Sequence, residues 1–236
     1  SLDRDVTGLG HVEETTGLDA MQAQSGNSSL DGSSIGIAFL DSGISTKHQK
    51  LSGRVAFSKD FTGEGTTDDN YGHGTFVASM IAAPAGRYGG IAPGAKIVNF
   101  RVLNSLGTGK TSALLSALDA VMTYRTTYNI RIVNMSLGTT AVSSYKNDAI
   151  CRAVRRLVDA GIVVVAAAGN EGKDALNRKV YGRIHSPGNE PSAVTVGAAN
   201  TFGSNDRKDD AVTSFSSRGP TAFRSEERRV GKECRS

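Results

Sequence analysis

The sequence has few cysteines and no long apolar run, and each shortage limits what the protein can be. Its two cysteines, Cys151 and Cys234, can form at most one disulfide, so cysteine usage does not fix the redox compartment. The longest apolar run, residues 162–168, has seven residues, whereas a helix that crosses a bilayer needs about 20. No membrane segment is therefore expected. Residues 1–5 do not form a basic and apolar leader, so any targeting peptide is expected upstream of Ser1.

What the sequence contains is typical of a folded globular domain. The chain has 236 residues, of which 38% are hydrophobic, enough to bury a sizeable core. Glycine is abundant at 28 residues but follows no three-residue period. The glycine content therefore indicates tight turns and excludes a collagen-like fibre.

Residues 224–236 differ in composition from the rest of the chain and show no apolar periodicity. They resemble the translation of a common short-read sequencing adapter, so we expect a non-native tail. Without its five basic and three acidic residues, the formal net charge falls from +4 to +2. The alternative, a basic arm that binds nucleic acid, loses its basis, and no nucleic-acid partner is expected.

Short apolar runs alternate with helical patterns along the chain, which is typical of a parallel sheet with crossover helices. Buried strands rich in Val and Ile are predicted at residues 35–40, 96–103, 131–135, 162–168 and 193–196. A helix is predicted over residues 111–124, with Thr111 or Ser112 as its N-cap. A second helix is predicted over residues 147–160, and Gly161 ends it. The predicted fold class is α/β.

Two polar side chains lie just after predicted strands, where reactive groups gather in an open parallel sheet. Asp41 follows the first strand and would supply a rigidly mounted acceptor, although an Asp there is also a common turn former. Asn170 follows the most apolar strand and can donate its amide to an oxyanion, or form an ordinary turn after Gly169.

His73 lies between Gly72 and Gly74, at the predicted start of a helix. The two glycines would clear space around the imidazole, whose ordinary pKa of about 6.5 suits proton transfer near neutrality. A capping or core histidine is the alternative. The other histidines, for which the sequence predicts no role, are His11, His48 and His185.

Taken together, the order Asp41, His73, Asn170 resembles the subtilisin-like serine proteases, or subtilases. Three further stretches carry the resemblance: Gly-Ile-Ala-Pro-Gly-Ala at 90–95, Asn-Met-Ser-Leu-Gly at 134–138 and Ser-Phe-Ser-Ser-Arg-Gly-Pro at 214–220. The resemblance covers roughly residues 31–221, and residues 128–131 are most similar to bacterial subtilases of the AprX type. It implies a doubly wound, mostly parallel sheet with helices on both faces, in a C-terminally incomplete catalytic domain over residues 25–223.

The resemblance also implies a mechanism, the hydrolysis of peptide bonds by an Asp/His/Ser triad. A serine would attack the peptide carbonyl, His73 would take its proton, Asp41 would orient His73, and Asn170 would donate to the oxyanion. Substrate backbone would pair with two strand edges, which favours broad selectivity, with an apolar or bulky residue before the scissile bond. The implied edges are Gly107, Thr108 and Gly109 together with Ser136, Leu137 and Gly138, and the implied side-chain pocket is lined by Ala166, Ala167, Ala168 and Gly169.

One feature of the family is missing. Subtilases carry their nucleophile in a Gly-Thr-Ser-x-Ala motif, and no such motif occurs in these 236 residues. Truncation into adapter sequence explains this absence better than evolutionary loss, so the chain as written is expected to hydrolyse little or nothing. A catalytically dead binding scaffold of the same fold is the first alternative. A nucleotide-binding domain is the second, but no Gly-x-Gly-x-x-Gly and no phosphate loop is found.

The resemblance implies partners as well. Residues 1–24 are similar to the junction between an inhibitory propeptide and a mature protease, so an upstream propeptide, secretion and a monomeric state are expected. No cofactor is required for the chemistry. Structural calcium is frequent in the family, but no ligand set can be named. The acids before His73 lack the spacing of a calcium loop and are interpreted as a solvated surface beside the cleft; they are Asp60, Glu64, Asp68 and Asp69. Without the C-terminal helices of the family, one apolar face of the sheet is expected to be exposed.

Overall fold

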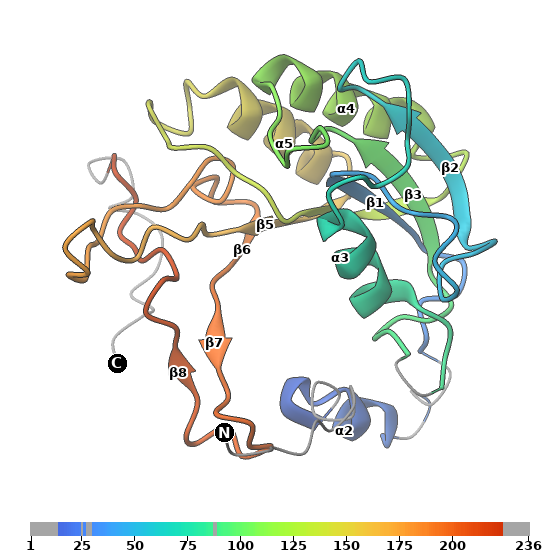
Figure 1. Ribbon diagram of the computed structural model, residues 1–236, viewed down its shortest axis with the longest axis horizontal. Coiled ribbons are helices and arrows are strands. Elements are labelled where there is room, and N and C mark those ends of the chain that lie inside the picture. The colour runs from blue at the N-terminus through green and yellow to red at the C-terminus, as the bar shows by residue number, and fades with distance from the viewer. Residues whose placement is uncertain (1–13, 25, 27–29, 87–88, 224–236) are drawn as a thin grey trace.

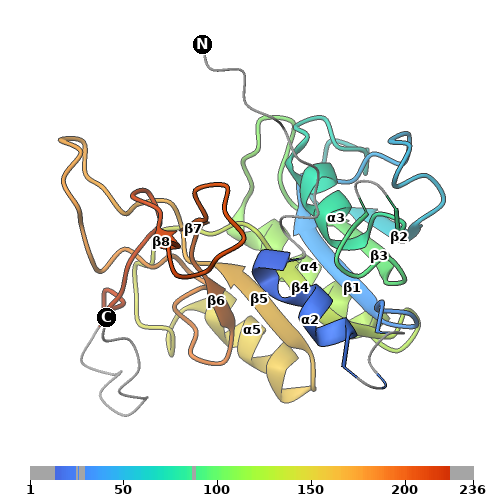
Figure 2. The ribbon, with the colours of Figure 1, turned by 90° about the horizontal axis from the view of Figure 1, so that it is seen from below.

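A six-stranded parallel sheet forms the centre of the molecule (Figure 1). The computed structural model describes residues 14–24, 26, 30–86 and 89–223. The strands are β1 (Gly36–Asp41), β2 (Val55–Asp60), β3 (Lys96–Arg101), β4 (Ile130–Met135), β5 (Val163–Ala167) and β6 (Val194–Val196). Their order is β2-β3-β1-β4-β5-β6, with every neighbouring pair parallel, and Figure 2 shows β2 and β6 at opposite edges. The predicted α/β class is confirmed.

Helices cover both faces of this sheet. Two of them, α4 (Thr111–Tyr124) and α5 (Ala149–Asp159), lie on one face, and α3 (His73–Ala82) lies on the other (Figure 1). Because side chains alternate along a strand, β1 contributes Leu40 to the apolar cluster of α4 and α5 and Phe39 to the cluster of α3. This two-sided arrangement buries β1 completely and brings its carboxyl end beside the start of α3.

The two edge strands differ from the prediction. Strand β2 has no counterpart among the predicted strands, because it is only partly buried and carries polar residues at its end. Strand β6 is predicted as buried, but Val194 and Val196 are 52% and 49% exposed. The prediction of burial is wrong there because β6 pairs with one neighbour only, and no helix of the described residues packs extensively on it.

The helix boundaries follow from their caps. The prediction that Thr111 or Ser112 caps α4 is wrong: the cap position is Lys110, whose side chain makes no capping bond. At α5 the Asp148 carboxylate accepts from the N–H groups of Ile150 and Cys151, which fixes the first turn. Gly161 has a positive φ of 82° just beyond α5 and ends that helix as predicted.

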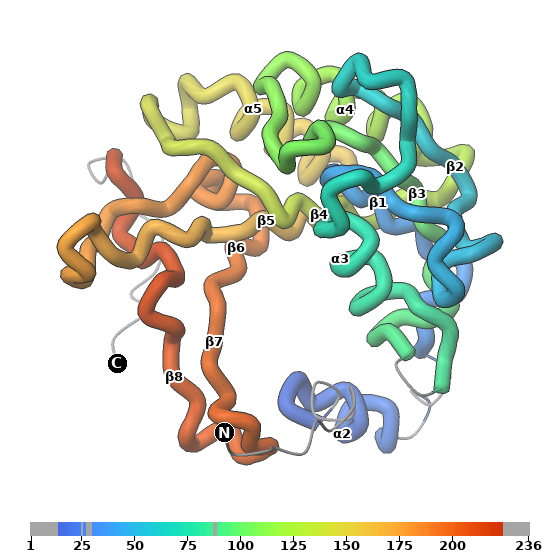
Figure 3. Tube along the Cα trace, viewed as in Figure 1, coloured from blue at the N-terminus to red at the C-terminus, as the bar shows by residue number. Residues whose placement is uncertain are grey.

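Smaller elements lie outside the sheet. A short helix, α2 (Leu18–Gln22), precedes it, and the antiparallel pair β7 (Ala199–Asn200) and β8 (Ala211–Val212) extends away from β6 (Figure 3). No helix among the described residues is long and apolar enough to cross a membrane. The adapter-like residues 224–236 and the first part of the predicted propeptide junction, residues 1–13, lie outside the described residues.

Candidate active site

Asp41 and His73 form a direct pair at the carboxyl end of the sheet. Asp41 ends β1 and is 1% exposed, and His73 is the first residue of α3. The Asp41 Oδ1 atom lies 2.8 Å from His73 Nδ1 and also accepts from the Ser42 N–H at 2.7 Å. With Nδ1 held by the carboxylate, Nε2 is the ring nitrogen available for proton transfer.

Burial and hydrogen bonding act in opposite directions on Asp41. Burial raises the pKa of its carboxyl above the ordinary value, and the hydrogen bonds from His73 and Ser42 limit the rise. Its second oxygen, Oδ2, is buried without a hydrogen-bond partner among the described residues. A carboxylate so placed depends on the imidazole for its stabilisation, and it stabilises an imidazolium in return.

A second carboxylate, Asp69, fixes the start of α3. Asp69 accepts from the N–H of Gly72 at 2.7 Å and from the N–H of Thr75 at 2.8 Å. The Ser42 hydroxyl donates to Asp69 at 2.9 Å and accepts from the Gly74 N–H at 2.9 Å. Although burial opposes it, the hydrogen bonds from Thr75 and Gly72 hold the pKa of Asp69 below its ordinary value. This network ties the helix that carries His73 to the residue that follows Asp41.

The glycines on either side of His73 shape the start of α3. A Cβ on Gly74 would lie 2.2 Å from the Gly43 carbonyl oxygen and 3.1 Å from Asp41 Cβ, so Gly74 permits the close approach of α3 to β1. A Cβ on Gly72 would meet nothing within 4 Å, but the residue has a φ of 100° at the helix start.

The acids before His73 are not a uniform solvated surface, and that interpretation is wrong for Asp60 and Asp69. Asp69 caps α3, as described above, while Asp60 and Glu64 face the fully buried Arg101, which Glu64 contacts directly and Asp60 approaches to 3.8 Å. Arg101 also donates to the Ser42 carbonyl at 3.0 Å. Asp68, 3.7 Å from exposed Lys47, fits the prediction, and Glu64 fits it in exposure although it also contacts Arg101. No cluster of three or more metal-ligating side chains occurs among the described residues.

A cleft of about 530 Å³ runs past His73 and Asn170. Both predicted substrate-binding edges line it, namely Gly107, Thr108 and Gly109 together with Ser136, Leu137 and Gly138. The predicted pocket residues are not among its lining residues; they are Ala166, Ala167, Ala168 and Gly169. Ala166 and Ala168 are buried, at 1% and 4% exposure, and His185 lies against Gly169. The structure therefore brings together every predicted site residue except this last group.

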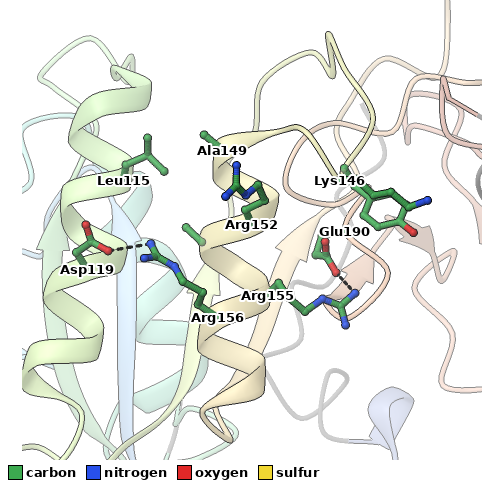
Figure 4. Close-up of a pocket in the computed structure, with 10 residues that line it drawn as sticks. Leu115, Asp119, Lys146, Ala149, Arg152, Arg155, Arg156 and Glu190 are labelled. Carbon is green, nitrogen blue, oxygen red and sulfur yellow. Dashed lines mark hydrogen bonds and ion pairs between the residues drawn. The ribbon is translucent and has the colours of Figure 1, made fainter.

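A separate hollow of about 610 Å³ lies between α4 and α5 on the outer surface (Figure 4). It contains two ion pairs, Arg155 with Glu190 and Arg156 with Asp119. Its lining residues include no nucleophile beside a base, so this hollow is not the candidate active site.

Three residues near the site have no predicted role in the sequence: Ser42, Asp69 and His185. Asp69 had a detectable signal, because an Asp shortly before a predicted helix start is a common capping residue. Ser42 and His185 had none, since their contacts join segments that are far apart in the sequence.

Known proteins share most of this sequence pattern. The chain matches the Subtilase family over residues 32–230. The serine protease AprX of Bacillus subtilis (strain 168) is 37% identical over 205 residues, which are 82% of this chain and 45% of AprX. Proteinase T of Parengyodontium album is 36% identical over 162 residues, 67% of this chain and 50% of that protein. Subtilisin E of Bacillus subtilis (strain 168) is 36% identical over 191 residues, 80% of this chain and 45% of that protein. The chain spans about half the length of these curated relatives.

Proposed function

Because the chain belongs to the subtilase family, as its resemblance predicted, we propose that the whole protein is a serine endopeptidase. The observation that carries the proposal is the 2.8 Å contact between buried Asp41 and His73, with Asn170 on the same cleft. A carboxylate, an imidazole and an amide donor at one cleft are the parts that acyl transfer to water needs besides its nucleophile.

In the proposed mechanism a serine hydroxyl attacks the peptide carbonyl and His73 Nε2 accepts its proton. Asp41 holds Nδ1–H and stabilises the imidazolium, and the Asn170 amide donates to the oxyanion of the tetrahedral intermediate. His73 then returns the proton to the leaving amine, and water releases the acyl group by the same steps. Loss of one oxyanion donor typically lowers turnover by about 10² to 10³.

The substrate proposed is an extended polypeptide. The two edges at residues 107–109 and 136–138 both line the cleft, and an extended chain bound there is proposed to pair with them through its backbone. Recognition of this kind depends little on sequence and favours broad selectivity.

The proposal has a second part, which concerns this chain alone. These 236 residues contain no Gly-Thr-Ser-x-Ala motif, so the nucleophile is assigned to sequence outside them, and residues 1–236 are proposed to hydrolyse little or nothing. A binding scaffold that has no nucleophile is the alternative. The scaffold alternative does not explain why Asp41 is buried beside His73 with one oxygen that lacks a hydrogen-bond partner among the described residues. Burying such a carboxylate costs free energy.

The remaining parts of the proposal follow the family. We propose that no cofactor takes part in the chemistry, that structural calcium has no assigned place, and that the protein is a secreted monomer processed from a propeptide form. None of these parts is needed for the mechanism.

The test is casein hydrolysis by the complete product of the gene, by its His73→Ala variant and by residues 1–236. The complete product should hydrolyse casein and react with a serine-directed fluorophosphonate, and His73→Ala should lower kcat by at least about 10³-fold. Full activity in the His73→Ala variant would refute the role of His73. Hydrolysis by residues 1–236 that His73→Ala abolishes would refute the second part.

A further inference from the structure

The Ser-Phe-Ser-Ser-Arg-Gly-Pro segment at residues 214–220 has no part in the proposed mechanism, yet it is hydrogen-bonded to the segment that carries Asn170. Asn170 itself is exposed, and its side chain makes no hydrogen bond with any described residue. An oxyanion donor works only when it is held within about 0.5 Å of the productive position. The direction of the Asn170 amide therefore depends on the backbone on either side of it.

Ser217 binds the backbone on both sides of Asn170. The Ser217 N–H donates to the Gly169 carbonyl at 2.9 Å. The Ser217 hydroxyl accepts from the Glu171 N–H at 3.0 Å. Only 5% of Ser217 is exposed, so both bonds lie away from bulk water. One residue thus holds the two peptide units that flank the Cα atom of Asn170.

Further contacts hold Ser217 in this place. The Gly172 N–H donates to the Phe215 carbonyl at 2.8 Å. The Arg218 guanidinium donates to backbone carbonyls within residues 213–216, the shortest of these bonds being 2.8 Å. A Cβ on Gly172 would lie 2.2 Å from a carbonyl oxygen of the 214–220 segment, so only glycine permits this close approach. The segment is therefore fixed against the residues that follow β5.

We infer that Ser217 is a positioning residue for the oxyanion donor, because its bonds to both flanking peptide units set the direction of the Asn170 amide. The inference rests on the proposed function. Ser217 is not among the residues that line the cleft, so it acts through Asn170. The oxyanion exists only in the tetrahedral intermediate. Loss of the Ser217 hydroxyl should therefore slow the chemical step and leave substrate binding unchanged.

The test measures kcat and KM of the complete product of the gene on succinyl-Ala-Ala-Pro-Phe-p-nitroanilide. Ser217→Ala removes the acceptor for the Glu171 N–H and keeps the backbone bond to Gly169. Ser216→Ala is the matched control, because Ser216 is also buried, at 1% exposure, and its hydroxyl accepts from the Ala198 N–H at 3.1 Å instead. Should Ser217→Ala fail to fold, Ser217→Cys takes its place, since a thiol has a similar size and is a weaker acceptor.

Ser217→Ala should lower kcat about tenfold at unchanged KM, a smaller loss than the roughly 10² or more expected of Asn170→Ala. In the Asn170→Ala background the same change should have no further effect on kcat, because no donor remains to be positioned. Ser216→Ala should keep kcat within about twofold of the unaltered protein.

An unchanged kcat in Ser217→Ala, an equal loss in Ser216→Ala, or the same fold-loss with and without Asn170 would overturn the inference and leave the proposed function standing. If Asn170→Ala itself leaves kcat unchanged, the proposed role of Asn170 fails, and the inference fails with it.

Amide hydrogen exchange of the ¹⁵N-labelled chain, residues 1–236, adds a readout that needs no turnover. The Glu171 N–H should be protected in the unaltered chain. Ser217→Ala should lower this protection at least about tenfold, and Ser216→Ala should preserve it. Unchanged protection in Ser217→Ala would overturn the inference whatever the activity of the complete protein.

Discussion

Asp69 provides most of the hydrogen bonds that place His73. Its two oxygens accept from the N–H groups of Gly72 and Thr75 and from the Ser42 hydroxyl. An Asn at this position would present an amide where one of these donors points, so part of the network would be lost. Because Ser42 follows Asp41 directly, the loss would also loosen the Asp41–His73 pair.

We predict that Asp69→Asn lowers the free energy of unfolding by about 1 kcal/mol at pH 7, the usual cost of a lost cap. The folded pKa of Asp69 is lowered, so its stabilisation is present above the unfolded value of about 3.9 and is lost as the pH falls through the folded value. Urea denaturation from pH 7 to pH 3 should therefore show the difference shrinking in acid. The matched control is Asp68→Asn, which should change stability little: the Asp68 carboxylate pairs with exposed Lys47 and accepts from the Asp69 N–H, and an amide oxygen can keep that second bond. If Asp69→Asn lowered the free energy of unfolding equally at all pH values, the assignment of ionised Asp69 as the cap of α3 would be contradicted.

The two outer helices begin in different ways, and the difference can be measured. The Asp148 carboxylate caps α5 at 2.8 Å and 3.1 Å from two backbone nitrogens, whereas Lys110 at the start of α4 has an extended backbone and no capping bond. We predict that Asp148→Ala destabilises the chain by about 1 kcal/mol and that Lys110→Ser stabilises it by about 0.5 kcal/mol or more. Urea denaturation of both variants checks this. Destabilisation by Lys110→Ser would show that the loop before α4 cannot position a cap.

Local sequence patterns predict the elements that pack on both sides. Strands β1, β3, β4 and β5 can be predicted from their own runs of Val and Ile, and α5 from its apolar stripe. Knowledge of the neighbouring elements is not needed, because burial alone selects these residues. Strand β2 cannot be predicted from its own sequence, because its position at the sheet edge and its pairing partner determine that it forms a strand. The β6 strand is recognisable as a strand, but its exposure depends on which helices cover it.

The candidate site also contains residues that local sequence patterns predict and residues that they do not. Asp41, His73 and Asn170 are predictable because strand ends and helix starts are local features that the fold brings together. The role of Ser42 depends on contact with a carboxylate 27 residues away. The position of His185 depends on two glycines in other segments. Such contacts appear only once the chain is folded.

At the scale of the whole molecule, the sheet face that α3 covers is open over β5 and β6 among the described residues. The register sets Ile37 beside Ile132 and Ile132 beside Val163, so Val163 lies on the face that α3 covers over β1. Over β5 and β6 that face is uncovered among the described residues, and Val163, Val194 and Val196 are about half exposed. Exposed apolar strand edges favour association.

We predict that residues 1–223 bind 8-anilinonaphthalene-1-sulfonate strongly and associate at raised concentration. The variant Val194→Lys should lower dye fluorescence and association several-fold, because a charge on an edge strand opposes pairing. Leu176→Lys is the control, since Leu176 is 71% exposed but lies away from the sheet in a loop. A monomer with no dye binding would contradict the open face.

The most direct measurement is to read the gene itself, from the codons for Ser136, Leu137 and Gly138 through Thr221 and beyond, with primers free of adapter sequence. We predict an open frame that departs from residues 224–236 and continues into a Gly-Thr-Ser-x-Ala motif, which would supply the nucleophile for Asp41, His73 and Asn170. A frame that encodes residues 224–236 in the genome and stops there would contradict the protease and favour the scaffold.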